Sequence, residues 1–447
     1  MSKDLTHGSP IKLILLFALP MLMGNVFQQF YAMADTIVVG QYIGVQALAA
    51  VGATGGITFF VLGFMMGLSN GFSIIVAQRF GSKDEAGVRK AVGNIIVLSI
   101  IFGIIVTFLS VGGARFILEL LNTPSDIIQY SFNYLVVIFG GLMATMAYNL
   151  IAAILRSLGD SKTPLIFLIV AAGLNVILDI LFITQFGMHV EGTAYATIIS
   201  QSISFICCFI YTKKRYPILH LSKDDFRLDH GLVRQLLRIA IPGAFANSIT
   251  AFGVMVLQGT INQLGSDYVA AYTAGTKVDQ FFTMPTMSLG MAMATFAGQN
   301  LGAGKLDRVK KGLKQTFVVS VGYSILGGVA LVTFGEFFVK LFVSDASGVV
   351  LEASMQYLRI IAMFCWALAI VFLFRNTIQG LGNGTVPMIT GFLELIMRVL
   401  VAIVLSKMIG FTGICLSNPI AWLAADVFLI PSYLKTMKNI QKQLGHA

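Results

Sequence analysis

The stretches QRFGSKDEAGVRKA (78–91) and QNLGAGKLDRVKKG (299–312) decide the fold of this chain. Each is a short basic loop between two long apolar segments, and Gly81 of the first precedes Gly302 of the second by 221 residues. IGVQALAAVGATG (43–55) stands at the same distance from LGSDYVAAYTAGT (264–276), and SLGDSKTP (157–164) lies 223 residues before GLGNGTVP (380–387). Such a nearly constant offset predicts a duplicated chain.

The composition excludes a water-soluble protein. Of 447 residues, 57% are hydrophobic and only 11% are charged, against about 25% charged in an ordinary soluble domain. The apolar residues fall in a dozen stretches, each long enough to cross about 30 Å of hydrocarbon as a helix. We therefore predict an all-α integral membrane protein of twelve transmembrane helices. The predicted spans are 12–38, 47–75, 91–113, 127–155, 163–185, 191–211, 232–262, 267–297, 312–334, 350–378, 386–410 and 413–434.

The repeat divides these helices into two lobes of six, residues 1–220 and 221–447. Because each repeat holds an even number of helices, the repeats are parallel and related by a pseudo-two-fold axis, and a central cavity between the lobes is the default binding site. Gly63, Gly67 and Gly71 recur every four residues in the second span. This spacing predicts a helix face that lets a neighbouring backbone approach closely.

The net charge of +10 reflects membrane topology rather than nucleic-acid binding. With a cytoplasmic N-terminus, the inner segments carry 24 Lys and Arg and the outer ones only Arg115, Lys340 and Lys407. This positive-inside bias predicts an inner (plasma) membrane protein with both termini in the cytoplasm.

The sequence carries no recognisable catalytic set, so we expect no enzyme and no cofactor. GLSNG (67–71) fits a hydrolase elbow but lies within a membrane span. A nucleotide-binding P-loop and the H-E-x-x-H zinc motif are both absent, and the four cysteines lack metal-ligand spacing.

Ionisable residues at bilayer depth are costly and mark functional sites. In the first half, Asp35 ends the first span, and Asn175 and Asp179 share one face of the fifth. Asp179 is about 24 Å along its helix from the inner side, and Thr197 of the sixth span reaches a similar depth. These oxygen-rich side chains could converge to hold Na⁺ or a proton; the alternative is an interfacial Asp35 and a structural Asp179.

The second half mixes acids and bases. Lys277 and Asp279 lie in the eighth span, Arg359 in the tenth, Glu394 and Arg398 in the eleventh and Asp426 in the twelfth. Glu394 and Arg398 are spaced to form an ion pair. A polar network around Lys277, Asp279, Arg359, Glu394 and Arg398 is therefore predicted, with a structural role and a transport role both open.

MADTIVVGQYIG (33–44) and ILRSLGDSKTP (154–164) resemble the multidrug and toxic compound extrusion family. This resemblance implies a two-lobed antiporter that exports cationic or amphipathic compounds in exchange for H⁺ or Na⁺. The DinF-like branch looks most similar, and its cation site falls on Asp35, Asn175, Asp179 and Thr197. The acidic residue that another branch carries in its seventh helix is missing from 232–262, which argues against a second cation site.

Other functions remain open at this point. Lys277, Arg359 and Arg398 would suit a flippase for lipid-linked saccharides, whose pyrophosphate needs cationic partners. A membrane enzyme or a channel fits the pattern less well. The expected partners are small organic substrates and membrane lipid, and the expected state is a monomer.

Overall fold

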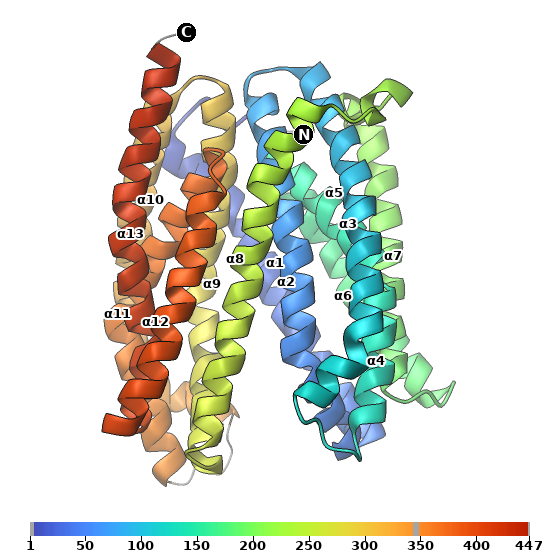
Figure 1. Cartoon of the computed structure of the whole chain (residues 1–447), viewed down its shortest axis with the longest axis vertical. Coiled ribbons are helices and arrows are strands. Elements are labelled where there is room, and N and C mark those ends of the chain that lie inside the picture. Colours follow the sequence, from blue (N-terminus) through green and yellow to red (C-terminus); the bar gives the residue numbers. More distant parts are fainter. Residues whose placement is uncertain (1–3, 343–347, 446–447) are drawn as a thin grey trace. The chain divides into compact units, whose positions relative to one another are not determined.

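The computed structural model describes residues 4–342 and 348–445, and every regular element in this part of the chain is helical (Figure 1). Lys3, counted above among the inner cations, lies outside the described residues. The first half contains α1 (Pro10–Val38), α2 (Val45–Gly81), α3 (Glu85–Leu120), α4 (Ile128–Gly140), α5 (Leu142–Ser157), α6 (Lys162–Thr184) and α7 (Val190–Arg215). The second half contains α8 (His230–Asn262), α9 (Ser266–Gly302), α10 (Leu306–Phe342), α11 (Gly348–Gly380), α12 (Thr385–Ile409) and α13 (Phe411–Gly445).

The helices match the twelve predicted spans, with two departures. Ten described helices are long and apolar enough to cross a membrane by themselves. The fourth predicted span is the pair α4 and α5, which meet at an angle of 47° beside Gly141. The eighth, α9, is 37 residues long but more polar. Most of α9 is buried within its own unit, so its surface need not be apolar.

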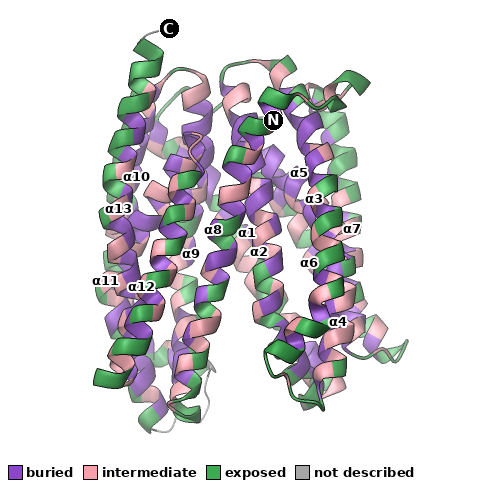
Figure 2. Cartoon of the chain, viewed as in Figure 1, coloured by how far each residue is buried: buried purple, intermediate pink, exposed green. Residues whose placement is uncertain are grey.

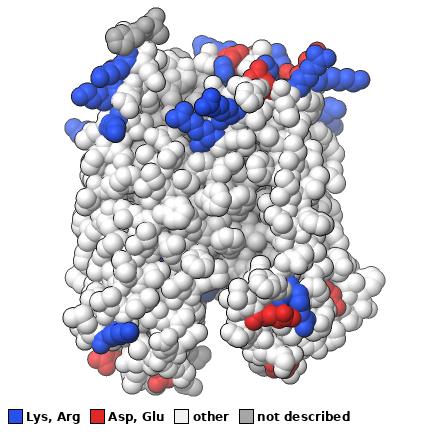
Figure 3. All heavy atoms as spheres, in the orientation of Figure 1, with Lys and Arg blue, Asp and Glu red and all other residues white. Residues whose placement is uncertain are grey.

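Exposed apolar side chains confirm a multi-pass membrane protein. Phe108, Leu326 and Val427 are 79%, 72% and 76% exposed, and other large apolar side chains are exposed in both halves. Figure 2 shows exposed positions along the helices of each half. A soluble protein rarely leaves such large apolar surfaces open to water. In each half the Lys and Arg side chains gather at one end of the helices (Figure 3), as the predicted charge asymmetry requires.

The chain forms two compact units, and two helices are shared between them. One unit holds Pro20–Ala244, while the other combines Leu5–Leu19 with the chain from Phe245 onward. The change of unit falls at Pro20 in α1 and just after Pro242 in α8. These prolines lie 222 residues apart (242 − 20), which agrees with the offset of the repeat, so they are equivalent. The compact units therefore differ from the predicted lobes, which were divided at residue 220 by sequence repeat alone.

Glycines allow the close helix packing that their spacing predicts. A Cβ added to Gly71 of α2 would lie 2.4 Å from the Cα of Ala240 in α8, and one added to Gly67 would lie 2.5 Å from the Cα of Ala244. These distances leave no room for a side chain, so α2 and α8 touch backbone to backbone in the first unit.

The segment between α7 and α8 is a short linker that contains two 3₁₀ turns, Pro217–Leu219 and Lys223–Phe226. We call residues 217–229 the strap. It lies against α3 in the first unit.

Candidate functional site

The candidate site lies in the first unit and begins on α1. Tyr31 and Asp35 are four residues apart and therefore share one face of this helix. Asp35 is half-buried, and its Oδ1 atom is fully enclosed with no hydrogen-bond partner among the described residues. The α1 helix ends at Val38 and is followed by a π-helical turn, Val39–Ile43. Asp35 thus occupies the last regular turn before this irregular segment.

Helices α6 and α7 bring the other predicted residues to the same place. Asn175 and Asp179 lie one turn apart on α6, and both side chains are completely buried. Asn175 Nδ2 donates to Thr197 Oγ1 of α7 at 3.3 Å. The hydroxyl of Tyr31 lies 3.0 Å from the same Thr197 oxygen. The four predicted residues therefore converge, although their role in binding an ion stays a prediction.

The carboxyl groups of Asp35 and Asp179 face each other. Tyr134 of α4, which is 9% exposed, lies close to both acids and to Tyr31. Both oxygens of Asp179 and the Oδ1 of Asn175 have no hydrogen-bond partner among the described residues. Neither acid forms an ion pair in this part of the chain.

This arrangement needs a positive partner. A buried acceptor without a donor costs about 1–3 kcal/mol, and an isolated buried carboxylate costs far more. Two facing carboxylates cannot both stay ionised unless a cation lies between them. The pair therefore holds either a proton or a cation. The unpartnered atoms are all oxygens, the ligand type that hard cations prefer. Among the described residues, no three Asp, Glu, His or Cys side chains are grouped so that they could hold a metal ion.

A small polar cavity of about 90 Å³ lies beside these acids. Its polar lining consists of Gln28, Tyr31, Thr145, Tyr148, Asn149, Ser200 and Gln201, and its apolar lining includes Leu62, Met66 and Leu168. The lining carries no charged side chain. Thr145 Oγ1 donates to Gln201 Oε1 at 2.6 Å, joining α5 to α7. This cavity can offer hydrogen bonds and apolar contacts to an organic molecule.

Tyr31 belongs to both places. Its side chain lines the polar cavity, and its hydroxyl contacts Thr197 beside the two acids. The prediction from sequence missed Tyr31, Tyr134 and the cavity because it started from the buried acids and added only Asn175 and Thr197 at matching positions on α6 and α7. The polar spacing was readable: Gln28, Tyr31 and Asp35 share one face of α1. On α7, Thr197 and Gln201 are likewise one turn apart.

The five polar residues predicted in the second half do not form one network. Glu394 and Arg398 make the predicted ion pair, with 3.8 Å between Oε2 and Nη2, and both side chains are only 6% exposed. Arg375, counted above as an inner-side cation, adds a second contact to Glu394 at 3.4 Å. Asp426 of α13 lies close to Glu394.

The other three predicted residues form no ion pair with this cluster in the described part of the chain. Asp279 lies against Tyr357 of α11. Lys277 and Arg359 are exposed, and neither forms an ion pair among the described residues. Lys277 and Asp279 are two positions apart, so they point to opposite sides of α9. Helix geometry therefore prevents the single network that residue type alone indicated.

Comparisons with known proteins agree with this architecture. The sequence pattern described as MatE matches the chain twice, over residues 20–181 and 244–404. The chain is 32% identical over 387 residues to a probable multidrug resistance protein, YpnP, of Bacillus subtilis, covering 85% of this chain and 84% of that protein. It is 29% identical to a probable multidrug resistance protein, NorM, of Thermotoga maritima, covering 86% and 83%. A crystal structure of MATE in complex with MaL6 superposes with a TM-score of 0.91 at 21% identity, covering 98% and 99%.

Proposed function

Because the chain belongs to the MatE family of multidrug and toxic compound extrusion transporters, we propose that it is a secondary antiporter. It exports cationic or amphipathic organic compounds in exchange for H⁺ or Na⁺, and the ion binds at Asp35, Asn175, Asp179 and Thr197. The relatives named as multidrug resistance proteins support the substrate class. The family consists of transporters rather than enzymes, and we propose no cofactor beyond the coupling ion.

One observation carries this proposal: Tyr31 joins the acidic pair to the polar cavity. An ion that neutralises Asp35 and Asp179 changes the contacts available to Thr197, which holds the Tyr31 hydroxyl at 3.0 Å. Any shift of α1 then moves Gln28 and Tyr31, two side chains of the cavity wall. Ion and substrate thereby favour different positions of the same helix, and such differential binding is what drives exchange.

The charge distribution supports the orientation. Lys and Arg gather at the end where α3 begins and α7 ends, and the positive-inside rule places this end in the cytoplasm. We therefore propose a monomer in the plasma membrane with both termini inside. Substrates would be released on the opposite side.

The decisive experiment uses purified protein in liposomes. A fluorescent organic cation is loaded, and its movement is followed under an H⁺ gradient alone and under a Na⁺ gradient alone. We expect one gradient to drive transport in the wild type and neither to drive it in Asp179→Asn. Undiminished ion-driven transport by this folded variant would contradict the coupling role, and transport of the dye without any ion dependence would contradict antiport.

A lipid-linked saccharide flippase is the second candidate. Lys277 and Arg359 are cations that are exposed within membrane-spanning helices and unpaired in the described part of the chain, and such residues could hold a pyrophosphate. Replacing both by Gln should leave dye export unchanged in an antiporter. Loss of dye export together with flipping of a labelled pyrophosphate lipid by the wild type would favour the flippase.

A further inference from the structure

A second, larger cavity lies in the first unit, away from the acidic pair. It measures about 600 Å³, within the range of about 300–1,000 Å³ that ligand sites in proteins occupy. Helices α3, α5 and α7 form its walls, and the strap covers its end. Its wall is mainly apolar, with Ile100, Met143, Met146 and Phe205 among its residues. We call it the strap cavity.

The mouth of the strap cavity is basic. Lys213 from the last turn of α7 and His220 from the strap both line it. Both side chains are exposed, and Lys213 forms no ion pair among the described residues. The strap acids Asp224, Asp225 and Asp229 do not line the cavity, and Lys213 is the lining residue that carries a formal charge. The free charge at this mouth is therefore positive.

Part of the polar wall lacks a partner. Ser99 of α3 lines the strap cavity and is 5% exposed, and its Oγ makes no hydrogen bond in the described structure. A buried hydroxyl without a partner costs about 1–3 kcal/mol. A ligand that carries ester or ether oxygens as well as apolar carbon would satisfy it.

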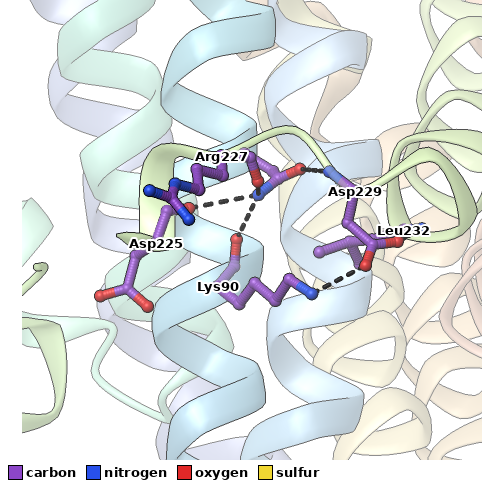
Figure 4. A network of polar contacts seen from close by, with 6 residues as sticks. Lys90, Asp225, Arg227, Asp229 and Leu232 are labelled. Carbon is purple, nitrogen blue, oxygen red and sulfur yellow. Dashed lines mark hydrogen bonds and ion pairs between the residues drawn. The ribbon is translucent and has the colours of Figure 1, made fainter. Parts of the chain in front are cut away.

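The strap holds this mouth in a fixed position. Asn94 of α3, which is completely buried, donates to the carbonyl oxygens of Asp225 and Arg227 at 3.2 and 3.0 Å and accepts from the Asp229 backbone at 3.0 Å (Figure 4). Lys90 adds an ion pair of 2.7 Å to Asp229. These contacts join the strap backbone to α3 beside the cavity.

The strap also has the surface of a segment at a membrane interface. Phe226 and Leu228 are 39% and 52% exposed, and they stand among charged residues of both signs, with the cations Lys223 and Arg227 and the acids Asp224, Asp225 and Asp229. Exposed apolar side chains mixed with Lys and Arg are typical of segments that lie among lipid headgroups. The mouth of the cavity therefore opens at headgroup level.

From these features we infer that the strap cavity binds an anionic phospholipid. One acyl chain fills the apolar space between α3, α5 and α7, an ester oxygen reaches Ser99, and the phosphate lies at Lys213 and His220. This lipid site is independent of the transport activity proposed above. It would make the packing of the first unit sensitive to membrane composition.

The test is native mass spectrometry of the purified full chain, titrated with phosphatidylglycerol or with phosphatidylcholine of the same acyl chains. We expect the wild type to retain phosphatidylglycerol preferentially. Lys213→Gln should weaken this retention about five-fold, the effect of one basic residue at a membrane surface. Lys214→Gln is the matched control, since Lys214 is also exposed but does not line the cavity.

A second variant tests the apolar part. Ala147→Phe places a ring in the strap cavity and should lower retention of both lipids, while circular dichroism checks that the protein is folded. Equal losses for Lys213→Gln and Lys214→Gln would overturn the proposal, as would equal binding of the two lipids. Displacement of phosphatidylglycerol by an exported organic cation would overturn it too, because the cavity would then be a substrate site.

Discussion

The two compact units share a fold but differ in how they treat buried acids. In the first, Asp35 and Asp179 face each other without a cation among the described residues. In the second, Glu394 is held between Arg375 and Arg398. A neutralised acid needs no ion from solution, whereas the acidic pair does. The two halves therefore share the same helices but differ in the partners of their buried acids.

The largest expected effect comes from removing one acid of the first unit. Asp35→Asn should reduce gradient-driven export to background, because it removes one of the two carboxyl groups at which the coupling ion is proposed to bind. Asp426→Asn, which changes a buried acid of the second unit, should retain export. Initial rates in liposomes measure both. Equal losses in the two variants would remove the distinction between the units.

The free energy of unfolding should rank the two units in the opposite order, with the larger loss in the second unit. Glu394→Gln leaves Arg375 and Arg398 without their carboxylate partner, and breaking a buried pair costs about 3 kcal/mol. Asp179→Asn removes an unpartnered buried charge, so its free energy of unfolding should not fall. Thermal unfolding in detergent, with both variants at one pH, gives the comparison. A stable Glu394→Gln protein would mean that Asp426 replaces Glu394 as the partner.

Glycine substitutions at close helix contacts should also destabilise the two units to different extents. Gly71→Ala forces a Cβ to 2.4 Å from the Ala240 backbone, and we expect a loss of about 1–3 kcal/mol. Gly290→Ala of the second unit meets the Phe372 carbonyl oxygen at 2.9 Å and should cost less. Gly52→Ala, with nothing within 4 Å, serves as the control. Unfolding midpoints of the three variants measure these losses. A larger loss for Gly290→Ala than for Gly71→Ala would contradict the prediction.

Thr197 tests the link between the ion site and the polar cavity. Thr197→Val removes the oxygen that Asn175 and Tyr31 contact, a loss of about 1 kcal/mol per hydrogen bond. We expect the apparent affinity for the coupling ion to fall several-fold while the maximal rate changes less. Thr184→Val, an exposed position at the end of α6, should leave affinity unaltered. If both variants behave alike, the hydroxyl has no part in coupling.

The smallest expected effect is the change in the stability of the strap with pH. The hydrogen bond from Lys90 lowers the pKa of Asp229 below its usual value, which is about 3.9. The strap therefore gains stability from this contact above pH 4, and the gain is lost as the pH falls through the lowered pKa. Hydrogen exchange of residues 222–229 between pH 6 and pH 3 measures it, and Asp229→Asn should remove the pH dependence.

The second unit provides the comparison for this experiment. There, residues before α1 are held without an acid: Leu5 donates to Gln299 at 2.9 Å, and Arg308 donates to the Gly8 carbonyl at 2.9 Å. Exchange of the Leu5 amide, whose partner is the neutral side chain of Gln299, should therefore not respond to acid in this range. Equal acceleration in both segments would indicate general unfolding rather than loss of the Asp229 contact.

The sequence predicted the helices well because apolar length is a strong signal, and the four residues of the proposed ion site could be brought together by depth and helix face. The prediction from sequence failed at features that depend on packing between helices. The bend beside Gly141 and the buried, polar α9 depend on neighbours that no single span reveals. Tyr134 reaches Asp35 and Asp179 from a different helix, so no spacing within one segment could identify it.

The shared helices have a consequence for a half-length chain. Because α1 and α8 each leave one compact unit for the other at equivalent prolines, a single repeat cannot complete a unit with its own first helix. A half-length protein with this path would complete its unit only by pairing with a second copy and exchanging the N-terminal part of that helix.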